Sequence, residues 1–183
     1  MHFGAWLFFM GTPKEPEKAI LFMGLLFVDE AHLLRAEDIL KKYYGNAVEE
    51  SEIFEWSHSG YYADEMGSEV KRKFILFDKI ISPEEIVDIK LNTNEIESEL
   101  SNDGKRTVNI DPGYITLGKL VLATTKNYSH RIYLGKGIYA EVTLYYRDED
   151  FQPTPFTYND YKQKEYRDFF KSSREYLKNR ANP

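Results

Sequence analysis

The spacing of hydrophobic and polar positions along the chain predicts an order of strands and helices. Residues 19–28 form an unbroken apolar run without a polar face, which is typical of a central strand buried on both sides. A helix should follow, because Asp29 is a suitable N-cap and apolar residues recur at helical spacing as far as Gly45, a residue that favours helix ends. We expect a second strand at residues 52–56.

The next stretch repeats this order. Residues 72–81 are rich in β-branched and aromatic side chains and predict a strand. Ser82, Pro83 and Glu85 then give a strong helix start, in which serine caps, proline occupies the first turn and glutamate completes a capping box. This helix should end before residues 102–104, and residues 107–110 predict a further strand. The resulting order, β-α-β-β-α-β, is the split arrangement of ferredoxin-like folds.

Beyond this unit the pattern predicts three additions. The sequence Asp-Pro-Gly at 111–113 indicates a turn, and the apolar spacing over 117–124 indicates a short helix. Strands at 130–134 and 138–146 should form a hairpin with a three-residue loop, which pairs Ile132 with Ala140 and Arg131 with Glu141. That register puts the apolar set, Ile132 and Ala140 included, on the core face. After a linker at 152–157, an amphipathic helix ends the chain. We therefore predict an α+β fold: a ferredoxin-like core extended by a helix, a β-hairpin and a C-terminal helix.

Composition limits the class of protein. With 183 residues, 42% of them apolar, the chain suits one domain with a sizeable core. Charged residues at 30% argue against a membrane-embedded protein, and the lack of cysteine excludes disulfides and thiolate metal sites. We expect a cytoplasmic protein. The apolar residues 3–10 are too few to span a bilayer, which takes about 20 residues. We interpret residues 1–10 as a non-native or disordered extension, with Met10 as the native start, and residues 11–183 as a single α+β domain.

Charge is unevenly distributed. The net charge of −6 argues against a general nucleic-acid binder. Residues 105–147, however, hold seven positive and two negative side chains, a local charge of +5, which leaves −11 for the rest of the chain. Either this segment binds an anionic ligand, or the two parts neutralise each other in the folded protein.

The stretch from Asn109 to Tyr146 (NIDPGYITLGKLVLATTKNYSHRIYLGKGIYAEVTLYY) resembles a family of bacterial and archaeal proteins known only as a domain of unknown function, DUF4416. The start at 11–16 (GTPKEP), the loop with Tyr61, Tyr62 and Glu65, and the sequence DGKR at 103–106 agree with this resemblance. Some members look to have been labelled GTP-binding, but the chain has no Gly-x-x-x-x-Gly-Lys-Ser/Thr loop for a nucleotide phosphate. The resemblance therefore implies no activity.

Hydroxyls and positive charges gather within eight residues, between the predicted short helix and the hairpin. Lysine and arginine neutralise phosphate oxygens, arginine bidentately, and threonine adds donors. Histidine is the side chain that most readily carries a proton near neutral pH. The alternative is that the lysine caps a helix and the arginine pairs with Glu141. The candidate ligand-binding residues here are Thr124, Thr125, Lys126 and Arg131, with His130 as a candidate acid–base residue and Tyr114 nearby.

Two carboxylates accompany these cations. Asp111 and Glu141 could hold Mg²⁺ together with a ligand phosphate, or act as a base and its partner. The alternative is structural: Asp111 starts a turn, and Glu141 pairs with Arg131.

A long loop at 57–67 is a third candidate, because long loops inside compact domains are often functional. Its residues Tyr61 and Tyr62 could stack on a planar ligand, with Glu65 beside them. The alternative is a loop held down by its own aromatic side chains.

Three hypotheses for function follow. The first is a binder, or an enzyme, for a phosphate-bearing small molecule such as a nucleotide, acting through residues 111–141. The second is an RNA-associated module that uses the same basic face with Tyr133, Tyr139 and Tyr145. The third is a protein-interaction domain without chemistry. A concave pocket would favour the first, an open positive sheet the second and a flat apolar patch the third.

Overall fold

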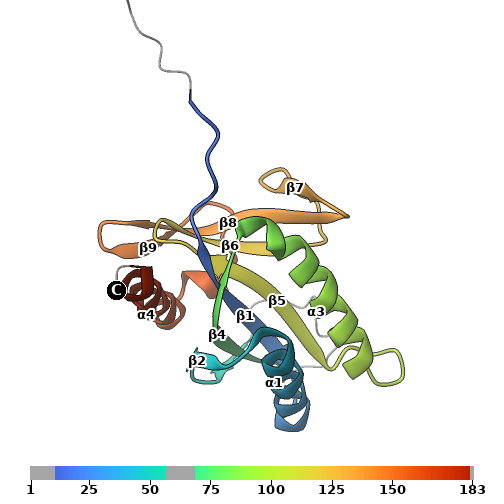
Figure 1. The fold of residues 1–183 in the computed structure, drawn as a ribbon. Coiled ribbons are helices and arrows are strands. Elements are labelled where there is room, and N and C mark those ends of the chain that lie inside the picture. Colours follow the sequence, from blue (N-terminus) through green and yellow to red (C-terminus); the bar gives the residue numbers. More distant parts are fainter. Residues whose placement is uncertain (1–10, 57–68, 182–183) are drawn as a thin grey trace, which may run out of the picture.

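A large antiparallel sheet organises the protein (Figure 1). The computed structural model describes residues 11–56 and 69–181, so our interpretation of residues 1–10 lies outside the described part. Within these ranges the sheet has nine strands: β1 (Ala19–Phe27), β2 (Ala47–Glu50), β3 (Phe54–Glu55), β4 (Lys71–Ile81), β5 (Val108–Ile115), β6 (Lys119–Thr124), β7 (Ile132–Gly135), β8 (Ile138–Arg147) and β9 (Asp150–Pro153). The strand order is β2-β4-β1-β5-β6-β8-β7, while β3 pairs with β4 and β9 with β8.

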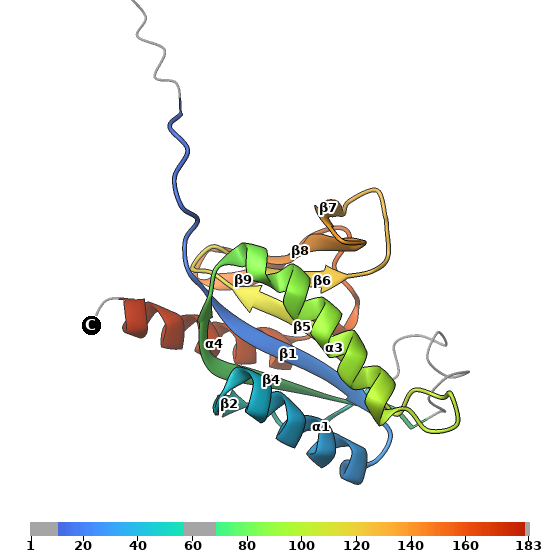
Figure 2. The ribbon, with the colours of Figure 1, turned by 45° about the vertical axis from the view of Figure 1, so that its right-hand side comes forward.

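Helices cover both faces of the sheet (Figure 2). The described residues include α1 (Glu30–Tyr44), α3 (Ile86–Leu100) and α4 (Lys164–Ala181). The first two pack with Leu21 and Met23 of β1 on one face, and α4 packs with Ile20 and Phe22 on the other. All nine residues of β1 are buried, as expected for a central strand with a hydrophobic layer on each side. None of the helices in the described ranges is long and apolar enough to cross a membrane.

Local signals place the helices as predicted. The Asp29 carboxylate accepts a hydrogen bond from the backbone N–H of His32 at 3.0 Å, which caps α1, and Gly45 ends that helix with a φ of 89°. Before α3, the Glu85 carboxylate accepts from the backbone N–H of Ser82 at 2.7 Å, as in a capping box. The mixed α+β class and the central place of residues 19–27 are therefore confirmed.

The segment after Ile110 differs from the prediction. Residues 111–113 do not turn, because β5 continues to Ile115, and the predicted helix over 117–124 is strand β6. Leu120 and Leu122 pack on the α4 face, while Val121 and Ala123 pack on the α1–α3 face. A strand covered on both faces carries apolar residues without alternation, so its spacing imitates a short helix. The second predicted strand, at 52–56, is shorter than expected, because only residues 54–55 form strand β3, and β2 at residues 47–50 was not predicted.

The hairpin has the predicted pair Ile132–Ala140, but its loop has two residues, because Gly135 pairs with Ile138. The prediction that its apolar side chains face the core is wrong for three of them, since Ile132, Leu134 and Val142 are exposed. An irregularity in the β6–β8 pairing, between Leu120 and Val121, changes which residues of β8 face α4. Glu141, predicted to lie on the outer face, is nevertheless buried, because its partner on β6, Leu122, packs in the α4 layer and that face of the sheet is covered as well.

Gly113 of β5 gives a test of this packing. A Cβ atom at this position would lie 2.5 Å from the ring of Phe22 and 2.6 Å from the backbone oxygen of Val121. Because the backbone atom cannot move aside easily, we expect Gly113→Ala to destabilise the protein by about 1–3 kcal/mol in urea unfolding. The control is Gly118→Ala, where an added Cβ atom would meet no heavy atom within 4 Å. Equal stability of the two variants would contradict this account.

Candidate functional site

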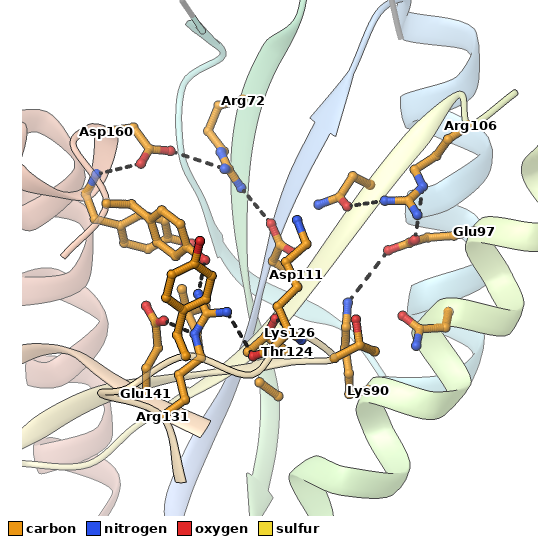
Figure 3. A pocket seen from close by; sticks show the side chains of 18 of the residues that line it. Arg72, Lys90, Glu97, Arg106, Asp111, Thr124, Lys126, Arg131, Glu141 and Asp160 are labelled. Atoms are coloured by element: carbon orange, nitrogen blue, oxygen red, sulfur yellow. Dashed lines mark hydrogen bonds and ion pairs between the residues drawn. The ribbon is translucent and has the colours of Figure 1, made fainter. Parts of the chain in front are cut away.

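A cavity of about 1020 Å³ lies where β5 and β6 separate (Figure 3). The two strands pair only between Gly113–Leu122 and Ile115–Leu120, although β5 begins at Val108 and β6 continues to Thr124. Side chains from both faces of the sheet line the resulting gap, from α3 on one side and from residues 156–161 on the other. Its volume is at the upper end of the range of small-molecule sites, about 300–1000 Å³.

The gap is held open from α3. Lys90 donates a hydrogen bond to the backbone oxygen of Ile110 at 2.8 Å, and the backbone N–H of Ile110 donates to Glu97 at 2.7 Å. A neighbouring strand would otherwise have to satisfy these two backbone groups. Because buried side chains satisfy them instead, β5 needs no strand partner at this position.

Glu97 connects this support to further polar groups. Its carboxylate lies 3.8 Å from the Lys90 ammonium and 3.5 Å from Arg106, which also donates to the side-chain oxygen of Asn109 at 2.8 Å. Burial raises the pKa of Glu97 above its ordinary value, although the Lys90 charge and the Ile110 N–H oppose that shift. This wall of the cavity is therefore an ion-pair cluster built on one helix face.

The opposite wall centres on Arg72 of β4, whose side chain is 4% exposed. Its guanidinium lies 3.2 Å from Asp160 and 3.4 Å from Asp111. Gly24 of β1 makes room for it, since a Cβ atom there would be 3.0 Å from Arg72 Nη1 and 3.1 Å from the Tyr161 hydroxyl. Burial alone would lower the pKa of Arg72, but Tyr161, Asp160 and Asp111 raise it above its usual value. The arginine therefore stays charged inside the protein.

A second arginine lies on the hairpin side. Arg131 Nε donates to Glu141 Oε2 at 2.8 Å, and both side chains are almost fully buried. Arg131 also donates to the backbone oxygen of Lys126 and to the Tyr158 hydroxyl. Burial, with Glu141 as a smaller cause, raises the pKa of Tyr158 to about 12, so its hydroxyl stays neutral. This pair thus fixes the loop between β6 and β7 against residues 156–158.

The structure brings most of the predicted site residues together. One cavity is lined by Asp111, Thr124, Thr125, Lys126, His130, Arg131 and Glu141. Tyr114 does not join them, because the β5 alternation directs it into the core on the α1–α3 face. Tyr61, Tyr62 and Glu65 lie outside the described residues. The two metal candidates, Asp111 and Glu141, each pair with an arginine. Among the described residues, no three or more histidine or acidic side chains form a group that could hold a metal.

Several residues that line the cavity were not predicted from the sequence, although the sequence contains signals for some of them. Gly24 interrupts an otherwise bulky apolar strand, and a strand glycine often marks a close approach of another group. Lys90 and Glu97 fall on the buried stripe of α3, beside Thr93 and Ile96, where charges are uncommon. Nothing in the sequence around Asp160 indicates that it would meet Arg72, because the contact joins residues 88 positions apart.

The lining also has unused hydrogen-bonding capacity. Four of its buried side-chain atoms have no hydrogen-bond partner among the described residues: Arg72 Nε, Asn109 Nδ2, His130 Nδ1 and Tyr161 Oη. Buried polar atoms of folded proteins are nearly always bonded, so four in one lining require an explanation. Three of the four belong to groups that donate: a guanidinium, an amide and a hydroxyl.

Fold and site together define an α+β protein with a polar, charge-lined cavity inside an antiparallel sheet. The chain matches the model of the family described as domain of unknown function (DUF4416) over residues 17–176, and it belongs to that family. This confirms the resemblance found in the sequence. Neither the curated proteins nor the solved structures compared with the chain include a match.

The Arg72 network should be needed for stability. Arg72→Met would leave the buried Asp160 carboxylate without its main cation, and breaking such pairs typically costs about 3–5 kcal/mol. We expect a loss of this size in chemical unfolding. Lys164→Met is the control, because it breaks an ion pair with Asp168 in which both side chains are exposed, and its unfolding curve should match that of the wild type.

Glu97 should make stability depend on pH. Its pKa is raised in the folded protein, so the folded state binds its proton more tightly than the unfolded chain does. Its contribution is therefore most favourable in acid, and declines as pH rises from the unfolded pKa of about 4.3 through the folded value. Glu97→Gln lacks this decline. The free energy of unfolding of the variant minus that of the wild type should therefore increase over the same rise in pH. Urea unfolding at several pH values tests this, with exposed Glu99→Gln as the control. A constant difference would contradict the prediction.

Proposed function

We propose that this protein binds a phosphate-bearing small molecule, such as a nucleotide, in the cavity between β5 and β6. The observation that carries the proposal is the charge of the lining. Five permanent cations line the cavity against four carboxylates, although the whole chain has a net charge of −6. The cations are Arg72, Lys90, Arg106, Lys126 and Arg131, and the carboxylates are Glu97, Asp111, Glu141 and Asp160. An excess of positive charge in a concave site attracts anions.

The unused donors support the same ligand class. A phosphate group offers several acceptor oxygens, and the guanidinium of Arg72, the amide of Asn109 and the hydroxyl of Tyr161 have donors to spare. These atoms belong to side chains that line the cavity. A phosphate could accept hydrogen bonds from these unpartnered donors, which an apolar ligand could not do.

Aromatic side chains around the site favour a ligand with a planar ring. Tyr128, Phe156 and Tyr158 line the cavity and are 64%, 56% and 44% exposed. Exposed aromatic groups beside a basic cavity are suited to stacking against a base while the phosphate occupies the interior. This is why we name a nucleotide rather than inorganic phosphate as the model ligand.

The alternatives have less support. An RNA-associated module would use Tyr133, Tyr139 and Tyr145 as one platform, but the pairing register puts Tyr145 on the opposite face of the sheet from the other two. A protein-interaction domain is supported by a different observation, the exposed apolar side chains Ile132, Leu134 and Val142 on the hairpin. That surface is separate from the cavity lining, so it does not compete with ligand binding.

We further propose that β1 to β5 with α1 and α3 form a ferredoxin-like split unit, to which β6–β9 are an extension. The order β2-β4-β1-β5, antiparallel throughout, and two helices on one face support this. The lack of cysteine is the support for a cytoplasmic location.

Lys126 provides the test of ligand binding. Its side chain is exposed at the cavity, so Lys126→Ala should leave the fold intact while removing one charged hydrogen bond to the ligand. With such bonds contributing about 1.5–3 kcal/mol, AMP affinity in calorimetry should fall about 10- to 100-fold. Lys119→Ala removes the same charge from an exposed position outside the cavity and should bind AMP as wild type does. Failure of the wild type to bind AMP, other mononucleotides or sugar phosphates would refute the proposal.

A further inference from the structure

The imidazole of His130 lies in the cavity wall in a fixed orientation. Its Nε2 atom is 3.2 Å from Glu141 Oε2, and its ring stacks on Phe156 with centroids 4.5 Å apart and planes 6° from parallel. The hydrogen bond fixes which edge of the ring faces the carboxylate, and the stack fixes the plane. The opposite edge, with Nδ1, therefore has one defined direction.

Glu141 is itself immobilised. Arg131 Nε donates to Oε2 at 2.8 Å, and the Thr143 hydroxyl donates to Oε1 at 3.1 Å, while the Glu141 residue is 4% exposed. An ionised carboxylate accepts hydrogen bonds only, so it selects the imidazole form with the proton on Nε2. The Nδ1 lone pair is then the basic site of the ring. A carboxylate also orients the histidine of Ser-His-Asp triads, although there it holds Nδ1–H and leaves Nε2 as the base.

Nδ1 is buried and has no hydrogen-bond partner in the described part of the protein. The fold therefore uses one nitrogen of His130 and leaves the other without a structural role. The charged groups around the ring are Glu141 on β8, Arg131 next to it and Lys126 earlier in the same loop, with the Tyr158 hydroxyl bonded to Arg131. None of these is hydrogen-bonded to Nδ1.

We infer that His130 is the acid–base residue of the cavity, positioned by Glu141, and that Nδ1 takes up a proton when a phosphate dianion binds. This rests on the proposed function. The proton comes from solvent, and the resulting imidazolium donates its Nδ1–H to a phosphate oxygen. A nearby dianion favours the charged form of the ring, so proton uptake accompanies binding and affinity falls as pH rises. A protonated histidine on a phosphate oxygen is also the group that general-acid cleavage of a phosphate ester requires.

Proton uptake can be measured directly. We expect the binding enthalpy of AMP near neutral pH to depend on the ionisation enthalpy of the buffer, with the sign of net proton uptake. His130→Gln should bind AMP, though more weakly, without this dependence. His32→Gln is the matched control, because His32 also contacts a carboxylate, that of Asp29, but lies outside the cavity lining. Buffer-independent binding of AMP by the wild type would overturn the inference and leave the proposed function standing.

The role of Glu141 has a readout that needs no ligand. Long-range ¹H–¹⁵N spectra of the free wild-type protein should identify the neutral His130 ring as the Nε2–H form. Glu141→Gln should lose this preference for the Nε2–H form, whereas Thr143→Val, which keeps the carboxylate, should retain it. An Nδ1–H tautomer in the wild type would overturn the positioning role even if Glu141→Gln does not fold. If AMP does not bind the wild type at all, proton uptake fails together with the proposed function, whereas the tautomer still decides whether Glu141 orients the ring.

Discussion

Two hydrogen bonds maintain the separation of β5 and β6: Lys90 donates to the backbone oxygen of Ile110, and the Ile110 N–H donates to the Glu97 carboxylate. A strand edge inside a sheet must have its N–H and C=O groups satisfied, and normally the next strand does so. Here a buried ammonium and a buried carboxylate from α3 replace that strand over one residue. The sheet can therefore divide around a cavity while both backbone groups of Ile110 keep hydrogen-bond partners. The remaining features of the site depend on this division, because it admits side chains from both faces.

Charge burial follows from the same geometry. Arg72, Arg131 and Lys90 are all removed from solvent, and each pairs with at least one carboxylate and with further hydrogen-bond acceptors or donors. Such networks rarely stabilise a protein more than an apolar core of equal volume would. Their concentration around one cavity is thus an argument for the proposed ligand binding rather than for a role in folding stability. The network also positions its members rigidly, since each guanidinium is held at more than one atom.

The His130–Glu141 pair and the cations lie in the lining of one cavity. In the proposed function the cations attract a phosphate group, and the oriented imidazole carries a proton beside it. In the described part of the protein the lining residues come from β4, β5, β6, β8, α3, the loop between β6 and β7 and the turn before α4. A site assembled from so many elements exists only when the whole sheet is folded, which couples ligand binding to global stability.

Local sequence determined the elements whose signals are short-range. The caps at Asp29 and Ser82, the central apolar strand and the amphipathic helices follow from hydrogen bonding within a few residues and from burial on one or two faces. The basic segment and its candidates Thr124, Lys126, Arg131 and Glu141 were also visible, because charge and residue type do not depend on the fold.

Only the tertiary structure decided the rest. The segment 117–124 is a strand because apolar layers cover both of its faces. The spacing of its apolar residues does not distinguish such a strand from a short helix. The exposure of Ile132 on β7, the last strand of the sheet order, and the burial of Glu141 beside Leu122 depend on which parts of the sheet other elements cover. Arg72 meets Asp160, and Lys90 meets Ile110, through contacts between residues far apart in the chain. Sequence patterns record the average environment of a residue, whereas a cavity is defined by which distant side chains converge and by where two strands stop pairing.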